Sequence, residues 1–283
     1  MWEEGKNIMG RNLPLPEEQK QKLIFNYSIM VPSTFQSVVS ITHITTAALL
    51  QIDDVVFLTD PVFGKAGIKH DLSHLFPNTT EPIFTSSLEI PALRLDQPPH
   101  IDAILLSHED HCDNLDPTGR QLLDGRKLVT TINGAKNLAS RPGALGAKPW
   151  ETQTHFIQGV EYQVTGTPCV HLPGGEVTGL ILRTELFGYS TDDLPTAIWV
   201  SGDTIYLEEL VEMKKKFHIV MAVVNLGAAK VEYSGASKPL LIGMGGNDAA
   251  RLVREIGIGI TVPVHYESWG HFYRVWRGVE EGL

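Results

Sequence analysis

One short segment of the chain concentrates side chains that bind metal ions. It follows a largely apolar run, Ile101 to Leu106, and contains two imidazoles and four carboxylates within ten residues. The segment is Ser107-His108-Glu109-Asp110-His111-Cys112-Asp113-Asn114-Leu115-Asp116. Neutral imidazole and carboxylate are ligands that suit zinc and its neighbours, and a loop at the end of a buried strand can aim several of them at one point. The segment therefore predicts a metal-binding loop.

Three later segments share this design, because an apolar strand ends and a potential ligand follows it. The ligands are His171, Asp203 and His265. Their segments are Thr165-Gly166-Thr167-Pro168-Cys169-Val170-His171, Ile198-Trp199-Val200-Ser201-Gly202-Asp203-Thr204 and Thr261-Val262-Pro263-Val264-His265-Tyr266. A single histidine at a strand end is more often a hydrogen-bonded structural residue than a ligand. The inference therefore depends on the ordered set of four segments and on their mutual geometry.

In this order the four segments resemble the metallo-β-lactamase fold superfamily. Its members carry an S-H-x-H-x-D-H loop, a later His, a G-D-T-type Asp and a final His after a last strand. The resemblance spans roughly residues 38–272, and Leu58-Thr59-Asp60-Pro61 resembles the branch of ascorbate-6-phosphate lactonase-like and N-acyl-phosphatidylethanolamine phospholipase-like enzymes. The resemblance implies an α/β protein, an αββα four-layer sandwich of mixed β-sheets with outer helices.

The first segment departs from the family pattern. Aligned at Leu106-Ser107-His108 and at Leu115-Asp116, it has one residue more than L-S-H-x-H-x-D-H-L-D, and Asn114 stands in place of the third family His. We expect His108 and His111 to be the paired imidazoles, with Asp113 as the loop carboxylate and Glu109 or Asp110 bulged out. Without the gap, Asp110 would replace the second His.

The resemblance implies two ion sites. One takes the imidazoles of His108, His111 and His171 with Asp203 as a bridge, and the other takes Asp113, Asp203 and His265. An amide oxygen is a weaker zinc ligand than imidazole, so Asn114 should lower affinity at the second site or favour Mn²⁺ or Fe²⁺ there. We expect one or two Zn²⁺ ions as cofactor. Further candidates to contact the metal or its ligands are Asp60, Asp110 and Asn114.

The expected chemistry is hydrolysis. A metal ion activates water and polarises the group under attack, so a separate protein nucleophile is unnecessary. Asp113 would orient that water or accept its proton. Candidates to donate a proton to the leaving group or to hold the developing oxyanion are Tyr206, Tyr266 and His271. Tyr266 and Trp269 either line the substrate pocket or belong to the core.

We therefore expect a metal-dependent hydrolase that uses metal-activated water on a small organic substrate, namely a lactone, an ester or an amide. A phosphodiester or phospholipid-type substrate is the second choice. Two other classes stay open: a metal-assisted lyase or isomerase, because a Lewis acid beside a carboxylate can also remove a proton next to a carbonyl, and a binding protein of the same fold that has lost catalysis through the altered loop.

Composition limits the partners. The chain has 283 residues, 42% of them hydrophobic, and 23 basic against 33 acidic residues give a formal charge of −10. Phosphate-rich polymers would meet a mostly repulsive surface, so nucleic acid is not expected as a partner. The sequence contains no run of about eighteen apolar residues, so we expect no transmembrane segment. We expect Cys112 and Cys169 to be small buried residues and not a disulfide pair. The default expectation is therefore a cytoplasmic location. The protein could form a homo-oligomer.

The pattern of apolar residues predicts the elements that position these side chains. We expect an N-terminal arm over 1–36, including a helix over 17–24, and a hydrolase domain over 37–283. The domain should open with an antiparallel meander, followed by a long excursion over 61–100 that could fold over the site. The meander strands are expected at 37–41, 47–52 and 55–59, and later strands at 128–131, 153–157, 161–165, 177–183, 197–201, 218–223 and 259–264. Helices are expected at 117–123, 134–139, 207–217 and 247–256. The last of these helices should have Asn247 or Asp248 as its N-cap.

Overall fold

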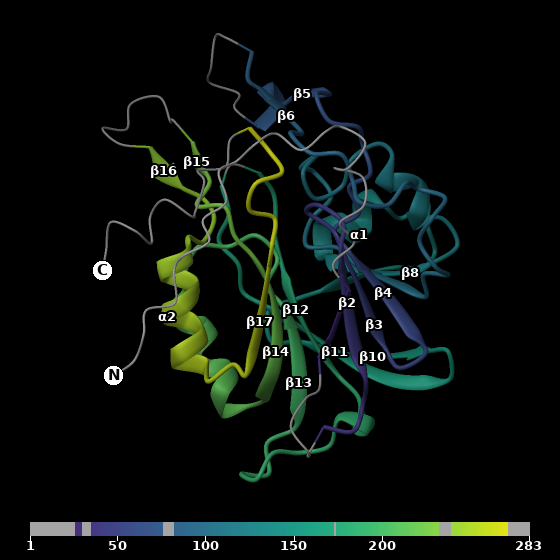
Figure 1. The fold of residues 1–283 in the computed structure, drawn as a ribbon, viewed down its shortest axis with the longest axis vertical. Coiled ribbons are helices and arrows are strands. Elements are labelled where there is room, and N and C mark those ends of the chain that lie inside the picture. The colour runs from purple at the N-terminus through teal and green to yellow at the C-terminus, as the bar shows by residue number, and fades with distance from the viewer. Residues whose placement is uncertain (1–25, 30–34, 76–81, 173, 232–238, 271–283) are drawn as a thin grey trace, which may run out of the picture.

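Two β-sheets pack face to face and carry the ligand-bearing loops at one edge (Figure 1). The structure, a computed structural model, describes residues 26–29, 35–75, 82–172, 174–231 and 239–270. The first sheet has the order β1 (Asn26–Ile29), β2 (Val39–His43), β3 (Ala48–Ile52), β4 (Val55–Thr59), β7 (Ala103–Leu105), β8 (Lys127–Thr131) and β9 (Ala144–Ala147). The second has the order β10 (Thr152–Ile157), β11 (Val160–Thr167), β12 (Gly179–Arg183), β13 (Thr196–Val200), β14 (His218–Asn225) and β17 (Ile260–Val264).

Strand direction explains why the predicted ligands lie close together. The strands β2, β3 and β4 form the predicted antiparallel meander, whereas β4, β7, β8 and β9 are parallel. In the second sheet β13, β14 and β17 are parallel. The carboxyl ends of parallel neighbours lie at the same edge of a sheet, which is where open α/β sheets bind ligands. The loops after β4, β7, β13, β14 and β17 therefore emerge close together.

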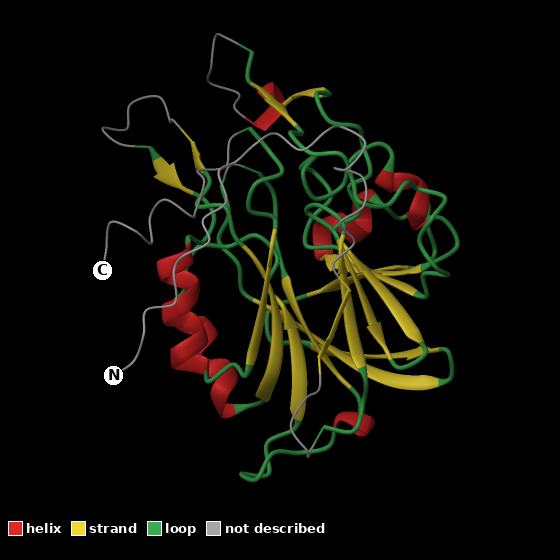
Figure 2. Cartoon of the chain, viewed as in Figure 1, coloured by secondary structure: helices red, strands yellow, loops and turns green. Residues whose placement is uncertain are grey.

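The core lies in three layers, as an αββα sandwich requires. Residues from both sheets fill the space between them; the Phe57 and Tyr162 rings meet there edge to face, with centroids 5.1 Å apart. Outside the first sheet lie the short helices η3 (Gly119–Leu123) and α1 (Ile132–Asn137). The 3-10 helix η5 (Glu208–Lys215) and α2 (Gly246–Ile256) cover the second sheet (Figure 2). The predicted fold class is confirmed, with few helices in the outer layers.

The excursion after β4 forms a small antiparallel hairpin of β5 (Lys69–Asp71) and β6 (Phe84–Ser86), with η2 (Ser73–Leu75) after β5. A second small hairpin pairs β15 (Lys230–Val231) with β16 (Leu240–Leu241). The remaining 3-10 helix is η4 (Glu185–Phe187). Both hairpins lie at the end of the molecule where the parallel strands end (Figure 1).

Several local predictions need correction. The predicted helices over 117–123 and 207–217 are 3-10 helices, η3 and η5. The N-cap of α2 is Gly245, so Asn247 and Asp248 lie within its first turn. Asp248 still favours the helix there, because a negative charge near the N-terminus interacts well with the helix dipole.

The segment expected as an arm contains β1, which pairs with β2 and extends the first sheet. The predicted helix over 17–24 lies outside the described residues. No helix in the described part of the chain combines the length and apolarity that a membrane span needs.

The contact between the sheets gives a stability prediction. Phe57 is 0% exposed and packs against Tyr162 of the other sheet, so Phe57→Ala should lower the free energy of unfolding by about 3–5 kcal/mol through lost burial and a cavity. Phe156 is 61% exposed, and Phe156→Ala is the matched control, with little change expected. Urea unfolding followed by fluorescence measures both; equal effects would contradict this account of the core.

Candidate metal centre

Two clusters of three potential metal ligands lie at the edge where the parallel strands end. The three-imidazole cluster consists of His108, His111 and His171; the carboxylate cluster consists of Asp113, Asp203 and His265. Within each cluster the ligand atoms lie within 4.8 Å of one another, and all six side chains are buried. The structure thus brings together the six residues that the sequence singled out as ligands.

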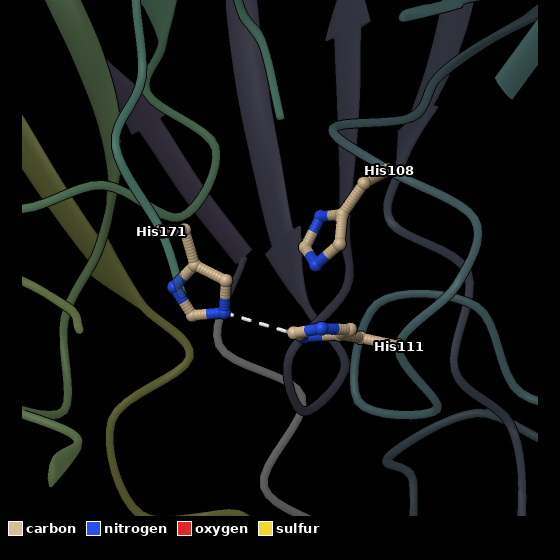
Figure 3. Close-up of side chains that lie close together, drawn as sticks. All are labelled: His108, His111 and His171. Carbon is tan, nitrogen blue, oxygen red and sulfur yellow. Dashed lines mark hydrogen bonds between the residues drawn. The ribbon is translucent and has the colours of Figure 1, made fainter. Parts of the chain in front are cut away.

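The rings of the three-imidazole cluster are oriented by hydrogen bonds on their outer sides. His171 Nδ1 lies 2.6 Å from the carbonyl oxygen of Ile242, which leaves Nε2 facing His111 Nδ1 at 3.2 Å. His108 Nδ1 lies 2.9 Å from Ser107 Oγ. Figure 3 shows the three rings converging. The nitrogens left to face one another are His108 Nε2, His111 Nδ1 and His171 Nε2; such outer partners are typical of metal-binding histidines.

The environment of His108 and His171 favours the neutral form of both imidazoles. Burial, followed by the proximity of His111, lowers the pKa of His108 to about 3. Burial also lowers the pKa of His171. Neutral imidazole is the form that binds metal, so these two side chains are prepared for coordination at neutral pH.

In the carboxylate cluster, charge attraction outweighs burial. His265 Nδ1 lies 3.4 Å from Asp203 Oδ1, and His265 Nε2 lies 3.8 Å from Asp113 Oδ2. Although burial opposes it, the carboxylates of Asp203 and Asp113 raise the pKa of His265. Asp203 also interacts electrostatically with His171 and His108 of the other cluster. Asp203, a member of the carboxylate cluster, is therefore close enough to the three-imidazole cluster to interact with it.

The buried polar atoms at this edge fit a cation. Four atoms of the loop and the clusters have no hydrogen-bond partner among the described residues: His108 Nε2, Asp110 Oδ1, Asn114 Oδ1 and Asp203 Oδ2. Buried polar atoms almost always have a partner, and an ion is one explanation for those that do not. One cluster offers nitrogen ligands and the other mainly oxygen ligands, sets that suit zinc and Mn²⁺ or Fe²⁺ respectively.

Comparison with known proteins agrees with this geometry. The family model described as "Beta-lactamase superfamily domain" matches residues 56–266. The chain belongs to the beta-lactamase superfamily. No match is found among curated protein sequences.

Solved structures share the fold of this superfamily member at low identity. An isothiocyanate hydrolase from Delia radicum gut bacteria is 18% identical over 85% of this chain and 90% of its own, with a TM-score of 0.62. A possible metal-dependent hydrolase from Veillonella parvula is 18% identical over 87% and 91%, with a TM-score of 0.60. A diiron β-hydroxylase from Streptomyces venezuelae, CmlA, is 15% identical over 83% of this chain and 45% of its own, with a TM-score of 0.54.

The altered metal loop of this beta-lactamase superfamily member adopts the gapped register. His111, and not Asp110, lies with His108 and His171. Asp110 turns away, and its Oδ2 accepts a hydrogen bond of 2.8 Å from the Gly175 backbone. Glu109 also points outward, with its Oε1 accepting a hydrogen bond from Asn137.

Asp60 supports the metal loop by accepting hydrogen bonds from its residues. Its carboxylate accepts hydrogen bonds from Ser107 N at 2.7 Å, Ser107 Oγ at 3.0 Å and Asn114 Nδ2 at 3.3 Å. Burial raises the pKa of Asp60 to about 6. Its φ of 35° and that of His265, 64°, are unusual for residues other than glycine, and strained backbone of this kind clusters at functional sites. Asp60 reaches His108 through Ser107 and is not among the clustered ligand atoms.

Asn225 is a residue that the sequence analysis missed. It ends β14, and its Nδ2 donates a hydrogen bond of 2.8 Å to Asp203 Oδ1. The signal was present, because Asn225 follows an apolar strand just as the ligands do. An amide is a weaker metal ligand than imidazole, so its residue type does not single out Asn225.

The proposed proton donors are placed differently from the ligands. Tyr206 points away: its hydroxyl donates a hydrogen bond of 2.6 Å to Glu255 Oε2 of α2, so its predicted catalytic role is not supported. Tyr266 follows His265 and stacks on His43. Trp269 is 1% exposed and contacts the His70 ring. His271 lies outside the described residues.

Two cavities flank the three-imidazole cluster. The larger, about 480 Å³, reaches His111 and lies between the 70–74 segment and the metal loop. The smaller, about 380 Å³, reaches His171 along the loop that follows it. The excursion after β4 thus forms a wall of the larger cavity, through His70 and His74 among others. Tyr266 and Trp269 line neither of these two cavities, and their role in substrate binding stays a prediction.

The two cysteines border these cavities. Cys112 lines the larger and Cys169 the smaller. Burial raises the pKa of both thiols, so they stay protonated at neutral pH. Both cysteines are free, as expected, but they are partly exposed, so the prediction that they are buried is wrong.

The register gives a testable difference between neighbouring residues. His111→Ala should remove about one equivalent of bound metal because it deletes an imidazole of the cluster, whereas Asp110→Ala should leave the metal content nearly unchanged. Elemental analysis by plasma mass spectrometry measures both variants side by side. Greater metal loss from Asp110→Ala would contradict the gapped register.

Asn114 gives a gain-of-ligand test. Its Nδ2 faces Asp60 while its buried Oδ1 has no partner among the described residues, so a histidine could donate one ring nitrogen to Asp60 and offer the other to a metal. Asn114→His should raise occupancy of the second ion, since imidazole is the better zinc ligand. A zinc titration monitored by calorimetry would show the additional equivalent of bound zinc. An unchanged stoichiometry would show that Asn114 does not limit zinc binding at the second site.

Proposed function

We propose that this protein is a metal-dependent hydrolase that uses metal-activated water on a small organic substrate: a lactone, an ester or an amide. The observation that carries the proposal is the pair of buried ligand clusters beside a cavity. His108, His111 and His171 would hold one ion, and Asp113, Asp203 and His265 a second. A divalent ion supplies a Lewis acid that polarises the scissile group and lowers the pKa of water.

The protein's own groups complete the proposed chemistry. Asp113 contributes a carboxylate to the cluster near His265, where it can orient water and accept its proton. Asp203 is held by Asn225, so its orientation is fixed before substrate binds. Asp60 and Ser107 fix His108 in the same way. Such preorganisation is what makes electrostatic stabilisation effective in an active site.

The larger cavity supports a small substrate. Its volume of about 480 Å³ lies within the usual range for small-molecule sites, roughly 300–1,000 Å³. Its lining is mixed: Leu72, Leu115 and Leu138 are apolar, while Arg120 and Asn137 are polar. This combination suits an organic molecule with a polar group to be oriented.

The relatives agree with hydrolysis without fixing the substrate or the ion. One of the solved structures is an isothiocyanate hydrolase, and hydrolysis is the kind of reaction proposed here. The diiron β-hydroxylase shares the fold and takes iron, so the fold alone does not select zinc or hydrolysis. Zinc is our first choice because three imidazoles form one of the sites.

Metal analysis tests the proposal first. The protein as purified without added metal should contain one or two equivalents of zinc, manganese or iron by plasma mass spectrometry. Asp203→Ala should lose most of it, because Asp203 belongs to one cluster and interacts with the other, whereas Asp192→Ala, an exposed carboxylate, should keep it. Chelation should abolish activity on a panel of lactones, esters and amides. Absence of metal after reconstitution would contradict the proposal.

A further inference from the structure

Glu109, in the bulge of the metal loop, is held by residues of two elements outside the ligand clusters, which also line the larger cavity. Asn137, at the end of α1, donates a hydrogen bond of 2.5 Å from Nδ2 to Glu109 Oε1. Arg120, in η3, donates from Nη2 to the backbone carbonyl oxygen of Glu109. We call Glu109, Arg120 and Asn137 the Glu109 clamp. Asn137 holds the side chain of Glu109, and Arg120 holds its backbone.

The clamp is built into the packing of the first sheet's outer layer. Glu109 is only 7% exposed, and a carboxylate is costly to bury unless it is hydrogen-bonded. A Cβ atom added at Gly134 would lie 3.0 Å from Glu109 Oε2, so α1 approaches the carboxylate closely at this glycine. Arg120 is half-buried and lies near the Glu109 charge, which offsets part of the cost of burial. Glu109 is therefore enclosed and not a solvated side chain.

The position of the clamp in the chain links it to the metal ligands. Glu109 directly follows His108, and Asp110 directly precedes His111. Asp110 is anchored on its own side by the Gly175 backbone. Both residues between His108 and His111 are thus held by hydrogen bonds, Glu109 by two and Asp110 by one.

We propose that Arg120 and Asn137 are positioning residues which, through Glu109, set the enlarged loop so that His111 Nδ1 faces His108 and His171. The proposal rests on the proposed function in one respect, that His111 is a metal ligand. It assigns a role to residues of η3 and α1 that lie outside both ligand clusters. The role is specific to the longer loop, because this chain has two residues between His108 and His111 where the family pattern has one.

The first arm of the test needs no metal. Hydrogen–deuterium exchange on the metal-free protein should be faster in peptides covering 107–116 for Asn137→Ala and for Arg120→Ala than for the wild type. Arg120→Lys, which keeps a cationic donor, should restore part of the protection. Asn133→Ala, an exposed residue of the same helix, and Arg141→Ala, which pairs with the exposed Asp124, are matched controls that should leave this loop unchanged.

The second arm measures the site itself. The two clamp variants should bind zinc about 10–100-fold more weakly at the tighter site, the range seen when residues that orient metal ligands are removed. The visible spectrum of the cobalt-substituted protein should shift, because the ligand geometry changes. The thermal midpoint of the metal-free protein shows whether each variant is folded; Asn137 is exposed, so its truncation leaves no cavity and removes one hydrogen bond from Glu109.

The two arms separate the clamp from the proposed function. Unchanged loop exchange together with an unchanged cobalt spectrum in Asn137→Ala would overturn the clamp, even if the protein is a metal-dependent hydrolase. A wild type that binds no metal would overturn the proposed function, and the exchange data would still decide whether the clamp holds the loop. If Arg120→Ala fails to fold, Asn137→Ala and Glu109→Gln carry both measurements.

Discussion

The arrangement of the two ligand clusters depends on keeping imidazole and carboxylate groups buried, with their potential ligand atoms facing one another. Such groups are costly to bury unless each has a partner, and here hydrogen bonds satisfy the outer atoms while inner atoms such as His108 Nε2 and Asp203 Oδ2 are left unpaired. Asp60 and Ser107 provide this support from the ends of neighbouring strands of the first sheet, and Asn225 provides it from a strand end of the second. The parallel strands of both sheets matter for the same reason, since they deliver these residues to one edge.

The strands and the ligand set could be predicted because each depends on local signals. The apolar runs that became β4 and β13 are buried on both faces, so they read as continuous hydrophobic segments. The ligands follow such runs directly, and the structure places all six of them together. The assignment of metal binding to these six residues stays a prediction, since geometry alone does not show an ion.

What could not be predicted depends on contacts between distant segments. The direction of Tyr206 is set by Glu255, a partner that lies on α2 and cannot be recognised from the sequence near Tyr206. The role of Asn225 likewise requires knowing that β14 ends beside Asp203. The 3-10 geometry of η5 is a further case, since its sequence has ordinary helix-forming residues. The hairpin of β5 and β6 is too short for periodicity to reveal it.

Each ligand cluster draws on both sheets. His108, His111 and Asp113 follow β7 of the first sheet, whereas His171, Asp203 and His265 follow strands of the second. An ion in either cluster would therefore join two halves of the sandwich that otherwise meet through apolar packing. It would act as a removable cross-link between segments far apart in the chain, comparable in this respect to a disulfide. Metal supply would then govern how firmly the two sheets are held together at this edge, as well as the chemistry carried out there.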